Sequence, residues 1–175
     1  MQAYERIDRR KIFDGKTRDS HEIRYRMARQ FIKDGDIVLD ACCGTGYGIQ
    51  FLKTPKALGM VRWIGIDKKP IHADISEYDF EREENIEIEP FDVFVGLECI
   101  EHLNHVGVIN FVGLAKQAKK YIVISTPITP NSNPFHVQQF TREAVLTMFK
   151  GGGWEDYAYF EQDEIYGIFI FKKTV

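Results

Sequence analysis

Short apolar runs alternate with longer amphipathic stretches along most of the chain. The run 37–39 has no polar side chain, which is typical of a strand buried on both faces of a parallel sheet. Apolar runs at 61–66, 91–97 and 121–125 predict three more strands. Between them, apolar spacing and capping residues predict helices over 20–33, starting at Ser20, and over 49–53, 100–119 and 141–149, the third broken near Gly107. This alternation predicts a doubly wound α/β fold with a mostly parallel sheet.

The C-terminal part of the chain has a different pattern. Two runs rich in aromatic and β-branched residues, 154–160 and 165–171, are separated only by a short polar turn near Gln162 and Asp163. A connection this short does not reach far enough for a parallel crossover, so the two strands must be antiparallel. We therefore predict an antiparallel hairpin at the C-terminal end of the sheet.

The composition is that of an ordinary globular domain. The chain has 175 residues, of which 44% are hydrophobic and 28% charged, so we expect one domain over 1–175, with a helical segment 1–35 that covers the functional site. No apolar stretch suits a membrane helix or a signal peptide. Cys42, Cys43 and Cys99 have neither the pattern of a disulfide framework nor zinc-site spacing, so we expect a reduced, cytoplasmic protein.

Charge is distributed unevenly along the chain. Residues 1–30 contain nine Lys or Arg and five Asp or Glu, whereas 74–101 contain eleven Asp or Glu and only Arg82 of opposite sign. The net charge of −3 does not fit a general polyanion binder, which carries a dominant basic surface. The basic N-terminus either contacts one phosphate-bearing substrate or is a solvated helix face.

The segment IVLDACCGTGYG joins a buried strand to a helix through a glycine-rich turn at 44–48. Glycines permit unusual backbone angles and let a ligand approach the main chain, where the helix start presents free N–H groups. Dinucleotide folds use G-x-G-x-x-G to seat a pyrophosphate. Here the spacing is G-x-G-x-G, and Asp40 stands at the strand end. Its carboxylate repels phosphate and attracts an amine, so the turn favours a donor with an aminoacyl end.

A second acid lies at the end of the next apolar run. Asp67 follows Gly46 by 21 residues, where an acid accepts both ribose hydroxyls of an adenosine. Each feature alone is weak, since glycine turns are common in α/β proteins. The order strand, acid, glycine turn, helix, strand and acid together indicates a nucleoside ligand.

This order of motifs resembles class I S-adenosylmethionine-dependent methyltransferases over nearly the whole chain. VLDACCGTGYG is similar to their first motif, WIGID to their second, FDVFVGLECIEHL to their fourth-strand motif and YIVISTP to their fifth strand. The resemblance implies a Rossmann-like seven-stranded sheet that ends in an antiparallel hairpin. It also implies S-adenosylmethionine as methyl donor, with Asp40, Gly44 and Gly46 at its methionine end and Asp67 at its ribose.

The same resemblance adds further donor-binding residues, which are Ala41, Cys42, Lys68 and Leu97. Cys42 stands where the family has a glycine, and we expect this small residue to be tolerated. Only 24 residues separate Asp67 from Asp92, so the third-strand region is expected to be shortened. Within it, IHADISEY is either the adenine-contacting segment, with Asp74 as the acid and Ile75 beside the ring, or a surface loop.

Polar residues cluster after the fourth predicted strand. If a helix starts there, Glu98, Glu101 and His102 share one of its faces. His102 is then a general base for an acceptor hydroxyl, assisted by Glu101. Alternatively the three bind a divalent cation such as Mg²⁺, which favours the acceptor alkoxide. A third reading gives them capping and fold-holding roles.

His136 is a fourth candidate metal ligand, because its loop leaves the same edge of the sheet. An E-x-x-E-H motif with a later His is similar to that of methyltransferases acting on the 3′-terminal 2′-hydroxyl of small RNAs and of ubiquinone-pathway O-methyltransferases. NPFHVQQFTRE is also similar to a loop in methyltransferases of glycan and natural-product clusters, in which a metal is not required.

These motifs lead to one main hypothesis and two alternatives. The main hypothesis is methyl transfer from S-adenosylmethionine to an oxygen of a small molecule or sugar. The site is covered either by the N-terminal segment and the loop 127–139 or by a second subunit. The alternatives are metal-dependent 2′-O-methylation of an RNA 3′ end and a non-catalytic, donor-binding regulatory protein. The chain lacks the N/D-P-P-Y/F/W motif of amino-directed DNA methyltransferases and the Pro-Cys turn of cytosine C5 enzymes. The oligomeric state and the identity of the acceptor are left open.

Overall fold

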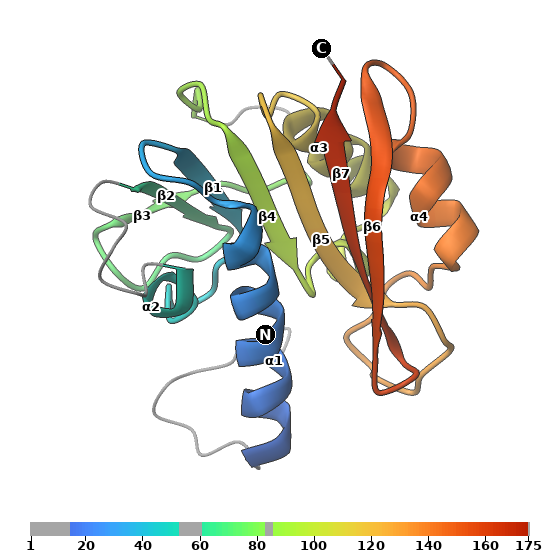
Figure 1. Cartoon of the computed structure of the whole chain (residues 1–175). Helices are drawn as coiled ribbons and strands as arrows, with labels where there is room; N and C mark the ends of the chain where they lie inside the picture. The colour runs from blue at the N-terminus through green and yellow to red at the C-terminus, as the bar shows by residue number, and fades with distance from the viewer. Residues whose placement is uncertain (1–14, 53–60, 83–85, 175) are drawn as a thin grey trace.

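A seven-stranded sheet with strand order β3-β2-β1-β4-β5-β7-β6 forms the centre of the computed structural model, which describes residues 15–52, 61–82 and 86–174 (Figure 1). Its strands are β1 (Ile37–Ala41), β2 (Arg62–Asp67), β3 (Ile75–Glu77), β4 (Val93–Leu97), β5 (Tyr121–Pro127), β6 (Trp154–Gln162) and β7 (Tyr166–Lys173). The first five strands pair in parallel, whereas β7 runs antiparallel between β5 and β6. The predicted α/β sheet and C-terminal hairpin are therefore confirmed. The third strand has only three residues, so the shortened third-strand region is confirmed too.

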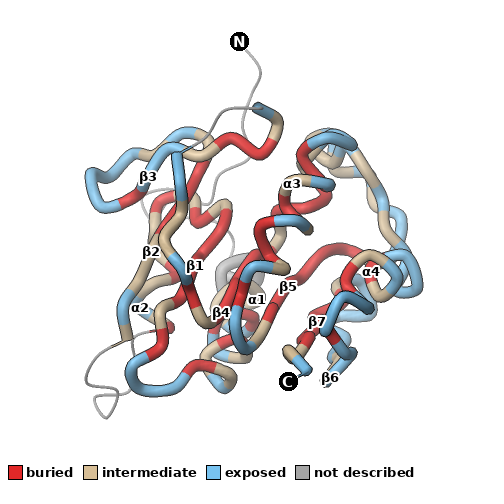
Figure 2. The backbone as a smooth tube through the Cα atoms, turned by 90° about the horizontal axis from the view of Figure 1, so that it is seen from above, coloured by how far each residue is buried: buried red, intermediate tan, exposed pale blue. Residues whose placement is uncertain are grey.

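Helices cover both faces of this sheet. They are α1 (Gly15–Ala28), α2 (Ile49–Leu52), α3 (His105–Ala115) and α4 (Arg142–Phe149), with short 3₁₀ turns η1 (Arg29–Phe31) and η2 (Ile100–His102). Phe111 of α3 and Phe149 of α4 pack into the apolar core on one face, and Tyr25 and Ala28 of α1 pack into the core on the other. The two cores lie on opposite faces of the central strands, whose residues are mostly buried (red in Figure 2).

Two of the predicted helices differ from the structure in their boundaries. The first helix starts at Gly15 rather than at Ser20, so Ser20 is an interior residue and not its cap. The predicted helix over 100–119 is divided into η2 and α3, and the break lies at Asn104 rather than near Gly107. The side chain of Asn104 accepts a hydrogen bond from the Gly107 N–H and so caps α3. For the predicted helix over 49–53, Lys53 lies outside the described residues.

The strand order reverses between β1 and β4. In open α/β sheets, ligands bind in the crevice outside the carboxyl ends of the strands at this switch point. Among the described residues, no helix is long and apolar enough to cross a membrane.

Candidate functional site

The glycine turn follows directly from the end of β1. Cys42, Gly44 and Gly46 all have positive φ angles, of 55°, 60° and 71°. Residues with a side chain rarely adopt this left-handed backbone conformation, which explains the two glycines. Cys42 adopts it although it carries a Cβ. Gly48 is required for a different reason, because a Cβ there would overlap the Tyr25 ring of α1. The turn is thus shaped both by its backbone and by the helix packed on it.

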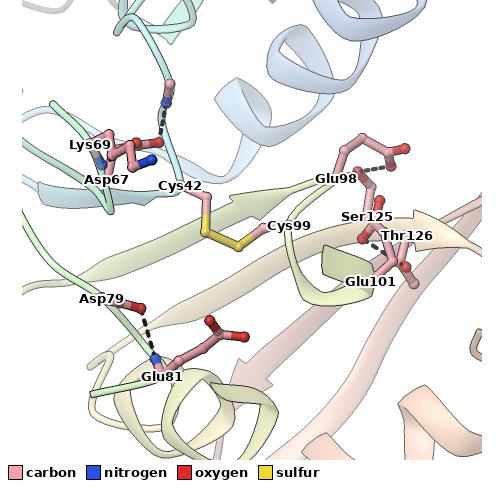
Figure 3. Close-up of a disulfide and its surroundings, with 11 residues drawn as sticks. Cys42, Asp67, Lys69, Asp79, Glu81, Glu98, Cys99, Glu101, Ser125 and Thr126 are labelled. Carbon is pink, nitrogen blue, oxygen red and sulfur yellow. Dashed lines mark hydrogen bonds between the residues drawn. A yellow bond between two sulfur atoms is a disulfide. The ribbon is translucent and has the colours of Figure 1, made fainter. Parts of the chain in front are cut away.

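Asp67 connects this turn to the end of β2. Its Oδ2 accepts a hydrogen bond from the Gly44 N–H at 2.9 Å, and its Oδ1 accepts one from the Lys69 N–H at 2.9 Å (Figure 3). Asp67 also lines the large cavity at this edge of the sheet. Its carboxylate therefore lies beside the glycine turn, at the carboxyl ends of β1 and β2.

A cavity of about 1060 Å³ extends along the carboxyl ends of the strands. Of the predicted donor residues, Cys42, Gly44, Asp67, Lys68 and Leu97 line it. Its volume is at the upper end of the range for small-ligand pockets, so it has room for more than one small ligand.

Asp40 does not reach the wall of this cavity. Its side chain is fully buried, and burial raises the pKa of its carboxyl well above the ordinary value. Tyr25, which interacts with Asp40, lines the cavity instead. Ala41, Gly46 and Ile75 are likewise not among the lining residues, and Ile75 packs beneath Gly46.

The two residues that the sequence predicted to contact adenine do not line the cavity. Asp74 is exposed, precedes β3 and does not line the cavity. Asp79 and Phe80, which follow β3, do line it. Asp79 is 4% exposed and lies 3.2 Å from the Lys68 Nζ. The sequence analysis did not single out Asp79, although its position after the carboxyl end of a parallel strand was a usable signal.

Glu101, His102 and His136 come together at the other end of the cavity. One potential ligand atom from each lies within 4.8 Å of the other two. The Glu101 side chain is buried, and its Oε2 accepts a hydrogen bond from the Thr126 hydroxyl at 3.0 Å (Figure 3). Its Oε1 has no hydrogen-bond partner among the described residues. Burial, and then the nearby Glu98 charge, raise the pKa of Glu101 well above its ordinary value.

Hydrogen bonds orient the two imidazoles of this cluster. The His102 Nδ1 lies 3.0 Å from the Phe135 carbonyl oxygen, so Nδ1 carries the proton and Nε2 is the basic nitrogen. The His136 Nε2 lies 3.0 Å from the Asn133 Nδ2, which donates to it. The His102 and His136 rings are in edge-to-face contact, with centroids 5.0 Å apart.

Glu98 is directed away from this cluster. Its Oε1 accepts a hydrogen bond from the Ser125 hydroxyl at 2.7 Å, and its Oε2 lies 3.8 Å from the Arg24 Nη1 (Figure 3). The expected single helical face for Glu98, Glu101 and His102 is wrong, because Glu98 precedes η2 with a φ of 53°. The structure thus groups three of the four candidate metal ligands and places Glu98 against a buried arginine.

The helix α1 supplies a third side of the cavity through His21 and Tyr25. The His21 Nδ1 lies 3.0 Å from the Tyr47 hydroxyl. Burial, followed by the charge of Arg24, lowers the pKa of His21 to about 3. His21 is therefore a neutral imidazole at physiological pH. On the side of the cavity near His102, the wall is formed by loop residues 131–137.

Cys42 and Cys99 form a disulfide between the ends of β1 and β4 (Figure 3). Their Cα atoms are 5.9 Å apart, within the range for a disulfide. The expectation that the cysteines remain unbridged is therefore wrong. Their separation of 57 residues hid the pairing from a spacing argument, because only the parallel pairing of β1 with β4 brings them together.

The same fold occurs in solved methyltransferase structures. The small RNA methyltransferase HEN1 matches with a TM-score of 0.66 and 17% identity over 98% of this chain, which spans only 27% of the HEN1 chain. A SAM-dependent methyltransferase from Aquifex aeolicus matches with a TM-score of 0.63 and 15% identity, over 94% of this chain and 100% of that chain. OxaC, solved with S-adenosylhomocysteine and oxaline, matches with a TM-score of 0.59 and 12% identity over 88% of this chain and 47% of its own.

No protein-family model and no curated protein matches the chain. At the identities of the structural matches, the likeness shows the fold alone. The chain therefore has the Rossmann-like fold of S-adenosylmethionine-dependent methyltransferases.

Proposed function

We propose that the protein transfers a methyl group from S-adenosylmethionine to an oxygen of a small molecule or sugar. The observation that carries this proposal is the arrangement of one cavity, which has the glycine turn and Asp67 at one end and Glu101, His102 and His136 at the other. A donor-binding end and a proton-accepting end in one cavity suit methyl transfer, because the reaction mainly requires donor and acceptor to be aligned.

The donor end is assembled from the ends of four strands, β1 to β4. Asp67 binds the ribose hydroxyls, and Asp79 with Phe80 contacts the adenine in place of Asp74 and Ile75. Lys68, which pairs with Asp79, fixes the orientation of that acid. Leu97 and the turn at Gly44 bound the methionine part. The carboxyl of Asp40 is buried and does not contact the donor itself. Asp40 instead interacts with Tyr25, which lines the cavity.

The acceptor end handles a proton. Because the Nδ1 of His102 faces the Phe135 carbonyl, its Nε2 is available to accept the proton of an acceptor hydroxyl. Glu101 lies next to it in a buried position, and Thr126 holds one of its oxygens. The helix α1 and the loop 131–137 cover the cavity, which limits the access of water to the donor.

The residues at the acceptor end also fit a divalent cation. The fit rests on the buried Oε1 of Glu101, which lacks a hydrogen-bond partner among the described residues, and on the two imidazoles beside it. Glu101, His102 and His136 would hold the ion. Two imidazole ligands favour a transition-metal ion over Mg²⁺. Such an ion, when bound, lowers the pKa of an acceptor hydroxyl.

RNA is the second candidate acceptor, and this three-residue cluster is the observation that favours it. HEN1, whose fold this chain shares, is described as a small RNA methyltransferase. On this alternative the acceptor is the 2′-hydroxyl at an RNA 3′ end, and the basic residues near the N-terminus contact its phosphates. Those residues before position 15 lie outside the described part of the chain.

Calorimetric titration with S-adenosylmethionine and S-adenosylhomocysteine tests the shared premise, since failure of both to bind contradicts the proposal. Transfer of a labelled methyl group is then measured to hydroxylated small molecules, to sugars and to an RNA oligonucleotide. A matched oligonucleotide with a 2′-deoxy 3′ end is the control for the RNA candidate. Each assay is repeated with a chelator. Donor binding with no transfer to any acceptor, and no effect of His102→Ala, indicates a regulatory, donor-binding protein instead.

A further inference from the structure

The disulfide lies at the point where the sheet changes direction. Cys42 directly follows β1, and Cys99 follows β4 after one intervening residue, Glu98. β1 and β4 are the neighbouring parallel strands at which the strand order reverses. Ligands of open α/β sheets bind in the crevice between these two strand ends. The S–S bond therefore bridges the floor of the crevice.

Both halves of the disulfide line the cavity. Cys42 is partly exposed, whereas Cys99 is 2% exposed. The third cysteine, Cys43, is buried and is not part of the bond. Cys42 and Glu98, which precedes Cys99, both have left-handed backbones. The bond thus joins two turns of unusual conformation, one of which carries the donor-binding glycines and the other leads to the Glu101 cluster.

We infer that Cys42 and Cys99 form a thiol–disulfide exchange site through which low-molecular-weight disulfides of the glutathione class control donor binding. This inference rests on the proposed function. In oxidation, the Cys42 thiolate attacks one sulfur of the small disulfide and releases one small thiol. The Cys99 thiolate then attacks the Cys42 sulfur and releases the second. Two protein thiols and one small disulfide thus become one protein disulfide and two small thiols.

Reduction runs through the more accessible sulfur. A small thiolate that enters the cavity attacks the Cys42 sulfur, because Cys99 is nearly fully buried. Cys99 leaves as a thiolate, and a second small thiol then releases Cys42 from the mixed disulfide. Access to the exchange site is through the donor cavity itself, so a bound donor also shields it.

We expect oxidation to weaken donor binding because the disulfide restrains the turn at Cys42. The bond connects this turn to the segment that follows β4, so the turn does not adjust its position to the donor. In the reduced protein, which lacks this covalent connection, we expect the turn to shift with Gly44 against the ligand. We expect S-adenosylhomocysteine to bind the reduced form roughly tenfold more tightly, within the usual range of coupling between two sites.

The test combines thiol counting with calorimetry on the full chain. Protein equilibrated with reduced glutathione is expected to have three alkylatable thiols in denaturant, and protein equilibrated with glutathione disulfide one. S-adenosylhomocysteine is then titrated into both forms. Three thiols under both conditions, or equal dissociation constants for the two forms, would overturn the inference. Absence of binding in both forms contradicts the proposed function instead, so the two failures are distinguishable.

Two cysteine variants provide the controls. In Cys42→Ser the ratio of dissociation constants between the two conditions should fall to one, because the accessible thiol is removed and no intramolecular disulfide forms. In Cys43→Ser the ratio should stay near ten, since Cys43 is not in the bond. A ratio that survives Cys42→Ser contradicts the inference, because the response then comes from another group.

Thermodynamic linkage supplies a readout that does not depend on activity. If the donor site prefers the reduced form tenfold, saturating S-adenosylhomocysteine must favour reduction by the same factor. The midpoint potential of the pair should then become less negative by about 30 mV for this two-electron couple. A midpoint potential that stays the same when S-adenosylhomocysteine is added contradicts the coupling between donor binding and reduction.

Discussion

The Nδ1 of His102 lies 3.0 Å from the carbonyl oxygen of Phe135, which joins the end of η2 to the loop that follows β5. The backbone N–H groups of Val137 and Gln138 donate to the Glu101 carbonyl oxygen, at 2.8 and 3.1 Å. The loop is therefore held directly on the two residues that the proposed chemistry needs most. It positions His136 beside them and fixes the tautomer of His102 at the same time.

Asn133 competes with a metal for His136, and this gives the first prediction. Its Nδ2 donates to the His136 Nε2 at 3.0 Å, and that lone pair is no longer available to an ion. We expect Asn133→Ala to bind Mn²⁺ several-fold more tightly than the wild type, because a competing hydrogen bond worth about 1 kcal/mol is removed. Isothermal titration with Mn²⁺ measures the change.

Asn131→Ala is the matched control, because it removes an acceptor for the Asn133 N–H in the same loop without touching His136. Its Mn²⁺ affinity should match that of the wild type. Equal affinity in Asn133→Ala and the wild type would show that the amide does not compete for the imidazole.

The second prediction separates two candidate adenine-binding acids. Asp79→Ala should weaken S-adenosylhomocysteine binding by roughly tenfold or more, since it removes a buried carboxylate acceptor that lines the cavity, and a hydrogen bond to a charged group contributes about 1.5–3 kcal/mol. Asp74→Ala should leave binding unchanged, because Asp74 is exposed and outside the cavity wall. The measurement is the dissociation constant by calorimetry. The opposite ranking of the two variants would restore the assignment made from the sequence.

The sequence predicted the parts of the fold that depend on local patterns. Apolar runs located the strands, and the short polar turn between the last two runs identified the antiparallel hairpin. The glycine turn and the position of Asp67 beside it also followed from the sequence, because the ends of neighbouring parallel strands meet at one edge of the sheet. These features need no knowledge of which side chains meet in space.

Contacts between distant segments were less predictable. Glu98 was expected beside Glu101 on one helical face, yet a left-handed backbone at Glu98 sends its carboxylate to Ser125 and Arg24. The Cys42–Cys99 bond depends on strand pairing across 57 residues. Asp40 was expected to face the donor, but α1 packs over it with Tyr25. Each miss involves a side chain whose direction is set by tertiary packing rather than by sequence spacing.

The third prediction concerns the contact between α1 and the glycine turn. Gly48→Ala should destabilise the protein by roughly 1–3 kcal/mol, because the added Cβ overlaps the ring of Tyr25, which is only 4% exposed and has little room to move. Gly113→Ala is the matched control, since nothing lies within 4 Å of a Cβ at that position of α3. It should be neutral or stabilise the helix by roughly 0.5–1 kcal/mol. Urea denaturation measures both changes, and equal stabilities would contradict the packing argument.

The last prediction is a pH dependence of stability that comes from His21. In the folded protein its pKa is lowered to about 3, mainly by burial and then by Arg24, from 6.5 in the unfolded chain. Between these values the unfolded state binds a proton that the folded state does not, so the free energy of unfolding falls as the pH falls below 6.5. The slope is about 1.4 kcal/mol per pH unit, which amounts to roughly 2 kcal/mol between pH 6.5 and 5.

His21→Asn removes this dependence while keeping an acceptor for the Tyr47 hydroxyl near the position of Nδ1. The variant does not titrate, so its stability should fall less than that of the wild type between pH 6.5 and 5, by roughly 2 kcal/mol. Contributions from other titrating groups cancel in this difference when the two curves are subtracted. Urea denaturation at closely spaced pH values measures both curves. Parallel curves would mean that His21 accepts a proton in the folded state, and its burial beside Arg24 would then not keep it neutral.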